Sequence, residues 1–165
     1  MGIFEVTESN TNLDKKELCT YICEISNIDK TKFSDAIKEA IMGILIVSGD
    51  NDIIHDSNDL KFIMEYGGIA FVGTAESNAK GSATKVIQLA IKNSSLNFDS
   101  IDKIAGFLIY FVIHPDFPIN DIIDAVEIIY ENAHDEADII WGTTTDESIS
   151  KDYVKAIILL TGFKK

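Results

Sequence analysis

The 165-residue sequence contains no arginine: all 14 of its basic side chains are lysines, against 27 acidic ones. Without arginine the chain lacks the planar guanidinium group that reads guanine edges and binds phosphates at two points. Its net charge of −13 also repels nucleic acid and anionic lipid surfaces at long range. We therefore expect this protein to bind neither nucleic acid nor a membrane.

Cysteine and long apolar runs are scarce as well. Cys19 and Cys23 are too few for a disulfide framework, and no histidine or further cysteine lies near them in sequence to complete a metal site, so we interpret them as small core side chains. No apolar run approaches the roughly 18 residues of a membrane-spanning helix. The N-terminus lacks the basic and apolar regions of a signal peptide. These absences predict a cytoplasmic protein.

Hydrophobic residues make up 46% of the chain, enough for one well-buried domain. The second half alternates strands and helices, which predicts crossover connections and parallel pairing. We expect the last two strands to be close enough to pair like a hairpin. The predicted strands are 69–72, 105–113, 138–143 and 153–161, and the predicted helices are 82–92 and 118–133, so the order is β-α-β-α-β-β.

The helix predicted for 118–133 begins at Pro118, a residue favoured in the first helical turn. Its apolar residues recur at helical spacing, which predicts an inner face packed against the sheet. The residues expected on that face are Ile122, Ile123, Val126 and Ile129.

The first part of the chain is predicted to be mainly helical. A short strand is expected at 3–6, followed by a helix that Asn12 caps and a second helix from Ser34 to Val47. Asn58 is expected to cap a further short helix, 59–66, which ends at the glycine pair 67–68.

Most polar clusters have a simple structural interpretation. His114 and Asp116 have the chemistry for acid–base work, but the prolines beside them favour a rigid loop. The acidic run 134–138 offers hard metal ligands, yet solvated charge is normal between a helix and a strand, and we expect no metal. Trp141 is interpreted as a core side chain. No glycine-rich phosphate motif is present, so no nucleotide or other cofactor is expected.

The densest acidic cluster lies between residues 50 and 59 and contains no lysine. A solvated loop explains it, and a functional loop is the alternative. The cluster consists of Asp50, Asp52, His55, Asp56 and Asp59.

From this loop onward, several short motifs follow one another to the end of the chain. Together they resemble the C-terminal, or activation, domain of FtsZ, the bacterial tubulin homologue, over residues 35–163. No single motif is diagnostic, but their order and spacing agree. The motifs are the loop Ile54–Asp59 with the helix Leu60–Met64 that follows it, the strand Gly68–Gly73, the helix end Ala90–Leu96, the strand start Gly106–Leu108, the strand Ala137–Thr143 and the closing Leu160–Phe163. Upstream of the loop, Asp35–Ile44 resembles the second half of the family's long central helix.

The resemblance implies an α+β fold, a mixed four-stranded sheet in β-α-β-α-β-β order with helices packed on one face. The N-terminal helices precede it. We divide the chain into an N-terminal extension with a short strand and helix, 1–34, and an FtsZ C-terminal-like domain, 35–163. The family's GTPase domain is absent from this sequence, and Lys30 and Ser34 stand where the family contacts guanine. No activity is expected from the chain alone.

In the family, the acidic loop of one subunit docks on the GTP-bearing face of the next, where its carboxylates position the attacking water. The resemblance therefore implies that Asp56 and Asp59 act in trans on a partner's GTP. Ile54 replaces the family's loop asparagine, which favours capping over activation of hydrolysis. The residues expected to contact the partner are Asp52, Ile54, His55, Asp56, Asn58 and Asp59.

Two functions follow as hypotheses. The first is a domain without a nucleotide site that docks on an FtsZ-type GTPase or its filament and caps or modulates polymerisation in cell division. The alternative is a degenerate FtsZ-like domain reused for protein interaction or self-association, with residues 1–30 covering a surface or forming a homodimer. An enzyme using His114 is disfavoured, because no nucleophile–base pair is evident. A further interpretation, that this chain is a fragment of a longer FtsZ-like protein, also stays open.

Overall fold

The computed structural model describes residues 2–6, 59, 62–63, 65–66, 68–94 and 96–164, with the backbone alone at 2–6, 68 and 69. The cysteines and the helices predicted between Asn12 and Val47 lie outside the described residues. None of the described helices is long and apolar enough to cross a membrane. The elements are β1 Gly2–Val6, β2 Gly68–Ser77, α4 Ala83–Asn93, the 3-10 helix η2 Phe98–Lys103, β3 Gly106–Ile113, α5 Ile119–Asn132, β4 Asp138–Thr145 and β5 Val154–Thr161.

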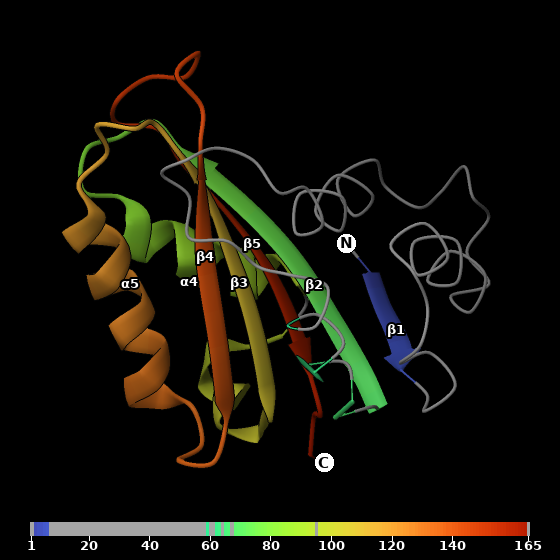
Figure 1. The fold of residues 1–165 in the computed structure, drawn as a ribbon. Coiled ribbons are helices and arrows are strands. Elements are labelled where there is room, and N and C mark those ends of the chain that lie inside the picture. The colour runs from blue at the N-terminus through green and yellow to red at the C-terminus, as the bar shows by residue number, and fades with distance from the viewer. Residues whose placement is uncertain are drawn as a thin grey trace, which may run out of the picture.

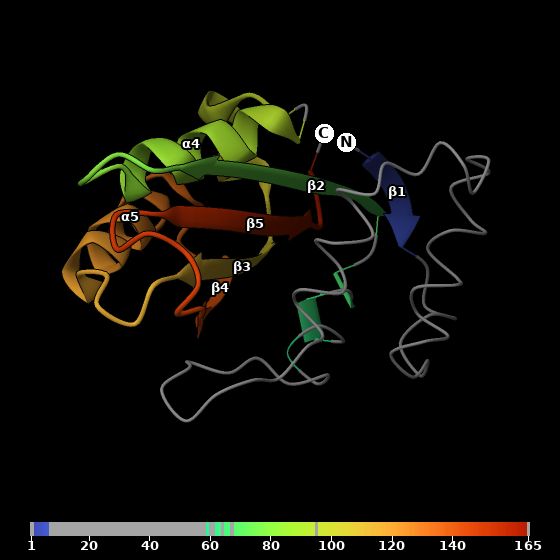
Figure 2. The same ribbon diagram turned by 90° about the horizontal axis from the view of Figure 1, so that it is seen from above.

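The strands form one mixed sheet in the order β1-β2-β5-β3-β4 (Figure 2). Strands β3 and β4 are parallel and are connected through α5, whereas β5 is antiparallel to both β2 and β3. From β2 to β5 the predicted β-α-β-α-β-β order and the mixed four-stranded sheet are confirmed. The predicted short strand at 3–6 also exists as β1, which adds a fifth strand by pairing antiparallel with the first half of β2.

The expected hairpin-like pairing of the last two strands is wrong. Strand β5 lies between β2 and β3, while β4 lies beyond β3 at the margin of the sheet (Figure 1). Burial is consistent with this order. Strand β5 is buried at seven of its eight positions, which is typical of a central strand with another strand paired along each of its two edges. Strand β4 is mostly half-exposed, as suits an outer strand.

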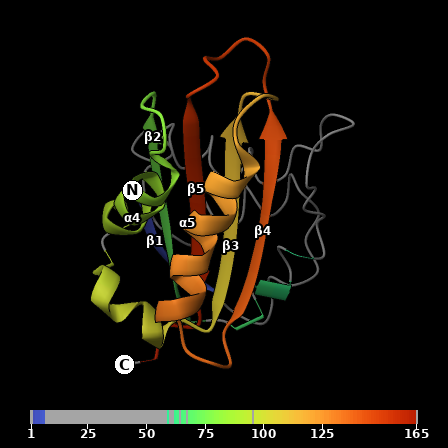
Figure 3. The same ribbon diagram turned by 90° about the vertical axis from the view of Figure 1, so that its left-hand side faces the viewer.

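Helices α4 and α5 cover the same face of the sheet, as predicted (Figure 3). Phe107, Ile109 and Phe111 of β3 point toward these helices and form part of the core. At Gly73 a Cβ atom would lie 2.0 Å from the carbonyl oxygen of Ala90, so glycine lets α4 approach β2 this closely.

The predicted inner face of α5 is correct at three of its four positions. Ile122, Val126 and Ile129 are buried, but the expectation for Ile123 is wrong, since its side chain is 46% exposed. Successive residues of an α-helix are rotated by about 100° around the helix axis. That rotation turns Ile123 away from the core and toward the surface beside β4, where it lines a groove with Trp141.

Candidate functional site

The predicted acidic loop meets the described part of the chain at one residue, Asp59. Its backbone is helical and its side chain is partly exposed, which agrees with the predicted short helix. The other residues expected to contact a partner lie outside the described residues, so their roles stay predictions. They are Asp52, Ile54, His55, Asp56 and Asn58.

Four residues after Asp59, the chain is fixed to the sheet at Ile63. The Ile63 side chain is completely buried. The hydroxyl of Thr161, the last residue of β5, donates a buried hydrogen bond of 2.5 Å to the carbonyl oxygen of Ile63. A buried carbonyl that lost this donor would incur a large desolvation cost, so the bond holds the backbone at Ile63 against the end of β5.

Tyr66 makes a second attachment at the same end of the sheet. Its hydroxyl donates a hydrogen bond to the carboxylate of Asp138, the first residue of β4. This bond, with smaller contributions from burial and from the Asp138 charge, raises the pKa of Tyr66 to about 12. The Phe62 ring meets the Tyr66 ring edge-on, with their centres 6.1 Å apart.

Two glycines make room for Tyr66. A Cβ atom on Gly106 would lie 2.8 Å from both Tyr66 Cδ2 and Thr161 Oγ1. Gly162 has a φ of 68°, and its Cβ would lie 2.7 Å from that of Ala105 and 2.9 Å from that of Tyr66. Glycine is therefore required at Gly162 for both backbone conformation and space.

Ile63, Tyr66, Gly106, Asp138 and Thr161 form what we call the anchor, which attaches the segment after Asp59 to the ends of β3, β4 and β5. Reasoning from the sequence missed the anchor as a unit. A signal was present, because four of its members belong to motifs that carry the family resemblance. Those four are Ile63, Gly106, Asp138 and Thr161.

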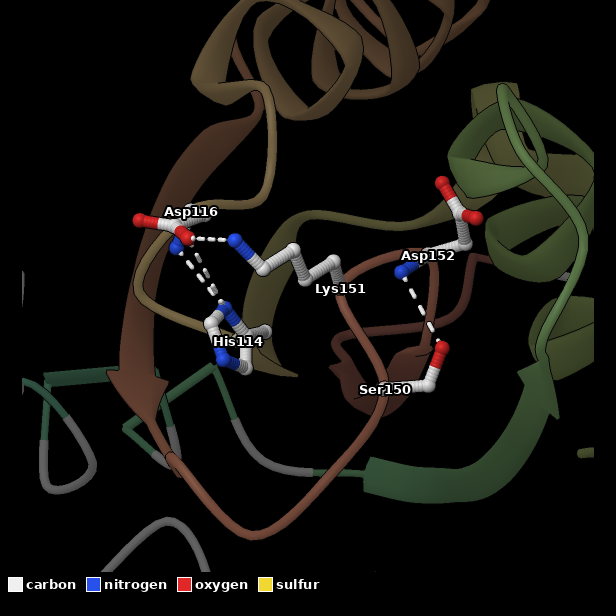
Figure 4. Close-up of polar contacts among 5 residues, drawn as sticks. All are labelled: His114, Asp116, Ser150, Lys151 and Asp152. Carbon is white, nitrogen blue, oxygen red and sulfur yellow. Dashed lines mark hydrogen bonds and ion pairs between the residues drawn. The ribbon is translucent and has the colours of Figure 1, made fainter.

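The predicted His114–Asp116 connection lies at the other end of β3 (Figure 4). Asp116 pairs with Lys151, and this hydrogen-bonded contact holds the pKa of the carboxyl below its usual range. His114 Nδ1 accepts a hydrogen bond of 3.0 Å from the Asp116 backbone N–H, so the ring closes the turn. The Ser150 hydroxyl similarly accepts the Asp152 N–H at 3.3 Å. These contacts stabilise loops, as expected, and lie far along β3 from the anchor.

The acidic run 134–138 is also used for turn and anchor contacts. His134 Nδ1 accepts a hydrogen bond of 3.1 Å from the Glu136 backbone N–H, and Asp138 is bonded to Tyr66. Within the described ranges, no group of three or more histidine, cysteine or acidic side chains is arranged to hold a metal ion. Trp141 packs against the core, as predicted, but stays partly exposed.

A family model described as the C-terminal domain of the FtsZ family matches residues 68–164. The chain belongs to the FtsZ family. Cell division protein FtsZ of Helicobacter pylori is 31% identical over 132 residues, which cover 79% of this chain and 34% of that protein. Cell division protein FtsZ 2 of Pyrococcus furiosus is 31% identical over 137 residues, which cover 81% of this chain and 33% of that protein. The chain thus spans about a third of the length of these relatives.

Solved structures agree with this family. A mutant FtsZ of M. jannaschii superimposes with a TM-score of 0.65 at 26% identity, over 78% of this chain and 39% of that one. A TubZ structure of Bacillus thuringiensis shares the fold alone, with a TM-score of 0.58 at 14% identity over 79% of this chain and 36% of that one. The FtsZ and tubulin fold proposed from the sequence motifs is therefore confirmed.

Proposed function

We propose that this chain docks its acidic segment, residues 50–60, on the GTP-bearing face of an FtsZ-type partner and caps or modulates that partner's polymerisation in cell division. The observation that carries the proposal is the anchor. It attaches the chain that follows the segment to the sheet, at Ile63 and Tyr66, four and seven residues after Asp59. A docking loop needs such a rigid base, because a loosely held carboxylate positions a water molecule poorly.

The chemistry of the segment supports a role in trans. Asp56 and Asp59 are the two acidic positions that the sequence shares with the family's loop, and carboxylates there orient and polarise a water molecule beside a partner's γ-phosphate. Ile54 brings a hydrocarbon side chain where the family has an amide. We therefore propose binding with slow or no stimulation of hydrolysis.

The test is a titration of full-length FtsZ from the same organism with this 165-residue chain. GTP turnover and the amount of sedimented polymer are measured together. We expect a substoichiometric amount of the chain to reduce the sedimented polymer, and Asp56→Asn and Asp59→Asn to weaken that effect. Asp99→Asn is the matched control, since Asp99 is an exposed carboxylate on η2. No change at a several-fold excess of the chain would overturn the proposal.

A second candidate is self-association, favoured by the position of β1. This strand comes from the N-terminal extension, pairs with β2 on one side and is the outermost strand on that margin among the residues that the structure describes. Outer strands offer backbone groups that a second copy can pair with. Sedimentation equilibrium over a range of concentrations tests it. A mass that rises with concentration, and that returns to the monomer value when 2–6 are deleted, supports self-association; a constant monomer mass excludes it.

A further inference from the structure

A cavity of about 150 Å³ lies at the end of the sheet where β3 and β4 begin (Figure 3). Parts of the chain that are distant in sequence line it: η2 with its link to β3, the connection between α5 and β4, and Lys164 beyond β5. Tyr66 of the anchor lines it as well. A cavity of about this volume accommodates a ligand of about six non-hydrogen atoms. Its ligand is therefore small.

Backbone hydrogen bonds join these parts of the chain to one another. Lys164 N–H donates to the Lys103 carbonyl at 2.8 Å, and Asp138 N–H donates to the Ala105 carbonyl at 2.9 Å. The Ile104 side chain is only 1% exposed and gives the cavity an apolar wall. Because the walls are already bonded together, a ligand that enters does not have to order loose chain, which favours its binding.

Charged side chains of both signs line the cavity. Lys103 and Lys164 provide two ammonium groups, and Asp102 and Glu136 provide two carboxylates, all on side chains exposed to solvent. Among the described residues, neither the two lysines nor the two carboxylates form a side-chain hydrogen bond or an ion pair. The opposite charges thus do not neutralise one another by direct contact, and both kinds remain available to a ligand.

His134 adds a hydrogen-bond donor to the cavity. Its Nδ1 accepts the backbone N–H of Glu136 at 3.1 Å, so the neutral ring carries its proton on Nε2. An Nε2–H group can donate to a carboxylate oxygen, as the lysine ammonium groups can. The cavity therefore offers donors for a carboxylate together with carboxylates that accept from an ammonium group.

The charge of the whole chain selects among ligands of this size. A net charge of −13 repels a small anion at long range, whereas a zwitterion has no net charge and is not repelled. We infer that the cavity binds a small zwitterion of the α-amino-acid class. The ligand's carboxylate lies between Lys103 and Lys164, and its ammonium group pairs with Asp102 or Glu136. This inference goes beyond the proposed function, because it concerns binding by the chain alone.

The test is a titration of the isotope-labelled 165-residue chain with L-alanine, followed by NMR of the backbone amides. We expect the amides of Ala105, Ala137 and Lys164 to shift saturably, in the millimolar range that suits so small a ligand. L-lactate and L-alaninamide match L-alanine in size, but lactate lacks the ammonium group and alaninamide lacks the carboxylate. Each should bind more weakly by about fivefold or more.

Matched variants test the two kinds of charge separately. Lys103→Met and Asp102→Asn should each weaken the binding of L-alanine by about fivefold or more. Lys92→Met and Asp99→Asn remove the same charges from exposed residues outside the cavity and should leave the binding unchanged. Circular dichroism confirms that the variants fold.

Three results would overturn the inference. One is the absence of a saturable shift with L-alanine. Another is binding of lactate or alaninamide as tight as that of L-alanine, since one of the two charges would then contribute nothing. The third is an equal loss in the cavity variants and their controls, which would show general electrostatic attraction. None of these results bears on the proposed docking, because no partner is present.

Discussion

Thr161 and Ile63 are 98 residues apart in sequence, yet the Thr161 hydroxyl donates a buried hydrogen bond to the Ile63 carbonyl. The bond connects the end of β5 to the segment that follows the acidic loop. It does so beside the contact between Tyr66 and Asp138, which connects the same segment to the start of β4. The two bonds therefore hold the chain at Ile63 and Tyr66 against both β5 and β4.

Thr161→Val tests the energetic importance of this bond. The substitution keeps the side-chain shape but leaves the buried Ile63 carbonyl without a donor, so we expect a loss of about 1–3 kcal/mol in the free energy of unfolding. Urea unfolding measures it. Thr74→Val in β2 is the control, since that half-exposed threonine lies in a strand away from the anchor and should change stability little. Equal effects of the two substitutions would contradict the anchor.

Gly162→Ala tests the close approach of Tyr66. Gly162 and Gly81 both have a positive φ, of 68° and 66° respectively. A Cβ atom added at Gly162 would collide with Ala105 and Tyr66, whereas one added at Gly81 would have no atom within 4 Å. Gly81→Ala should therefore cost only the backbone strain, about 1 kcal/mol, and Gly162→Ala clearly more. Thermal unfolding of the two variants compares them, and an equal decrease in Tm would show that the space around Tyr66 is unimportant.

The raised pKa of Tyr66 predicts a loss of stability in alkali. Its folded-state pKa of about 12 exceeds the ordinary value of 10.0, so the folded state favours the protonated hydroxyl. This contribution is complete below pH 10 and is lost as the pH rises through 12. Asp138→Asn removes the carboxylate that causes the shift, so tyrosinate absorbance should show one tyrosine titrating at lower pH than in the original protein. An unchanged titration curve would contradict the Tyr66–Asp138 contact.

Lys151→Ala tests the interpretation of the connection after β3 as structural. Removing the ammonium should return the pKa of Asp116 toward its ordinary value of 3.8, as measured by NMR of the side-chain carboxyl. The variant should affect the polymerisation of a partner FtsZ as the original chain does, because the pair lies at the opposite end of β3 from the anchor. A changed effect on polymerisation would show that this end takes part in docking.

The local sequence pattern predicted the positions of the strands and helices better than it predicted which strands pair with each other. Strands and helices from β2 to β5 follow from apolar periodicity, since each pattern is contained in a few consecutive residues. The insertion of β5 between β2 and β3 depends on pairing between distant residues, although the continuous apolar run of β5 was a clue to its central position. Ile123 was misplaced because a helix next to the sheet margin has fewer neighbours than the periodic pattern assumes.

In the candidate site, too, features contained in a few consecutive residues could be predicted, and contacts between distant residues could not. Asp59 and its neighbours could be proposed as a site because acidic residues and family motifs are visible in sequence, and that proposal stays a prediction. The anchor was not, because Tyr66 and Asp138 are 72 residues apart and neither periodicity nor composition relates them. Only the family motifs around Gly106, Asp138 and Thr161 pointed to the ends of the three strands where the anchor forms.

The most direct test of the proposed docking is the length of GTP-driven filaments of a full-length FtsZ from the same organism, measured by electron microscopy with this chain or its Asp59→Asn variant added. Capping predicts that substoichiometric amounts of the original chain shorten the filaments and that Asp59→Asn restores most of their length. Filaments of unchanged length at a several-fold excess, or equal shortening by both proteins, would contradict it.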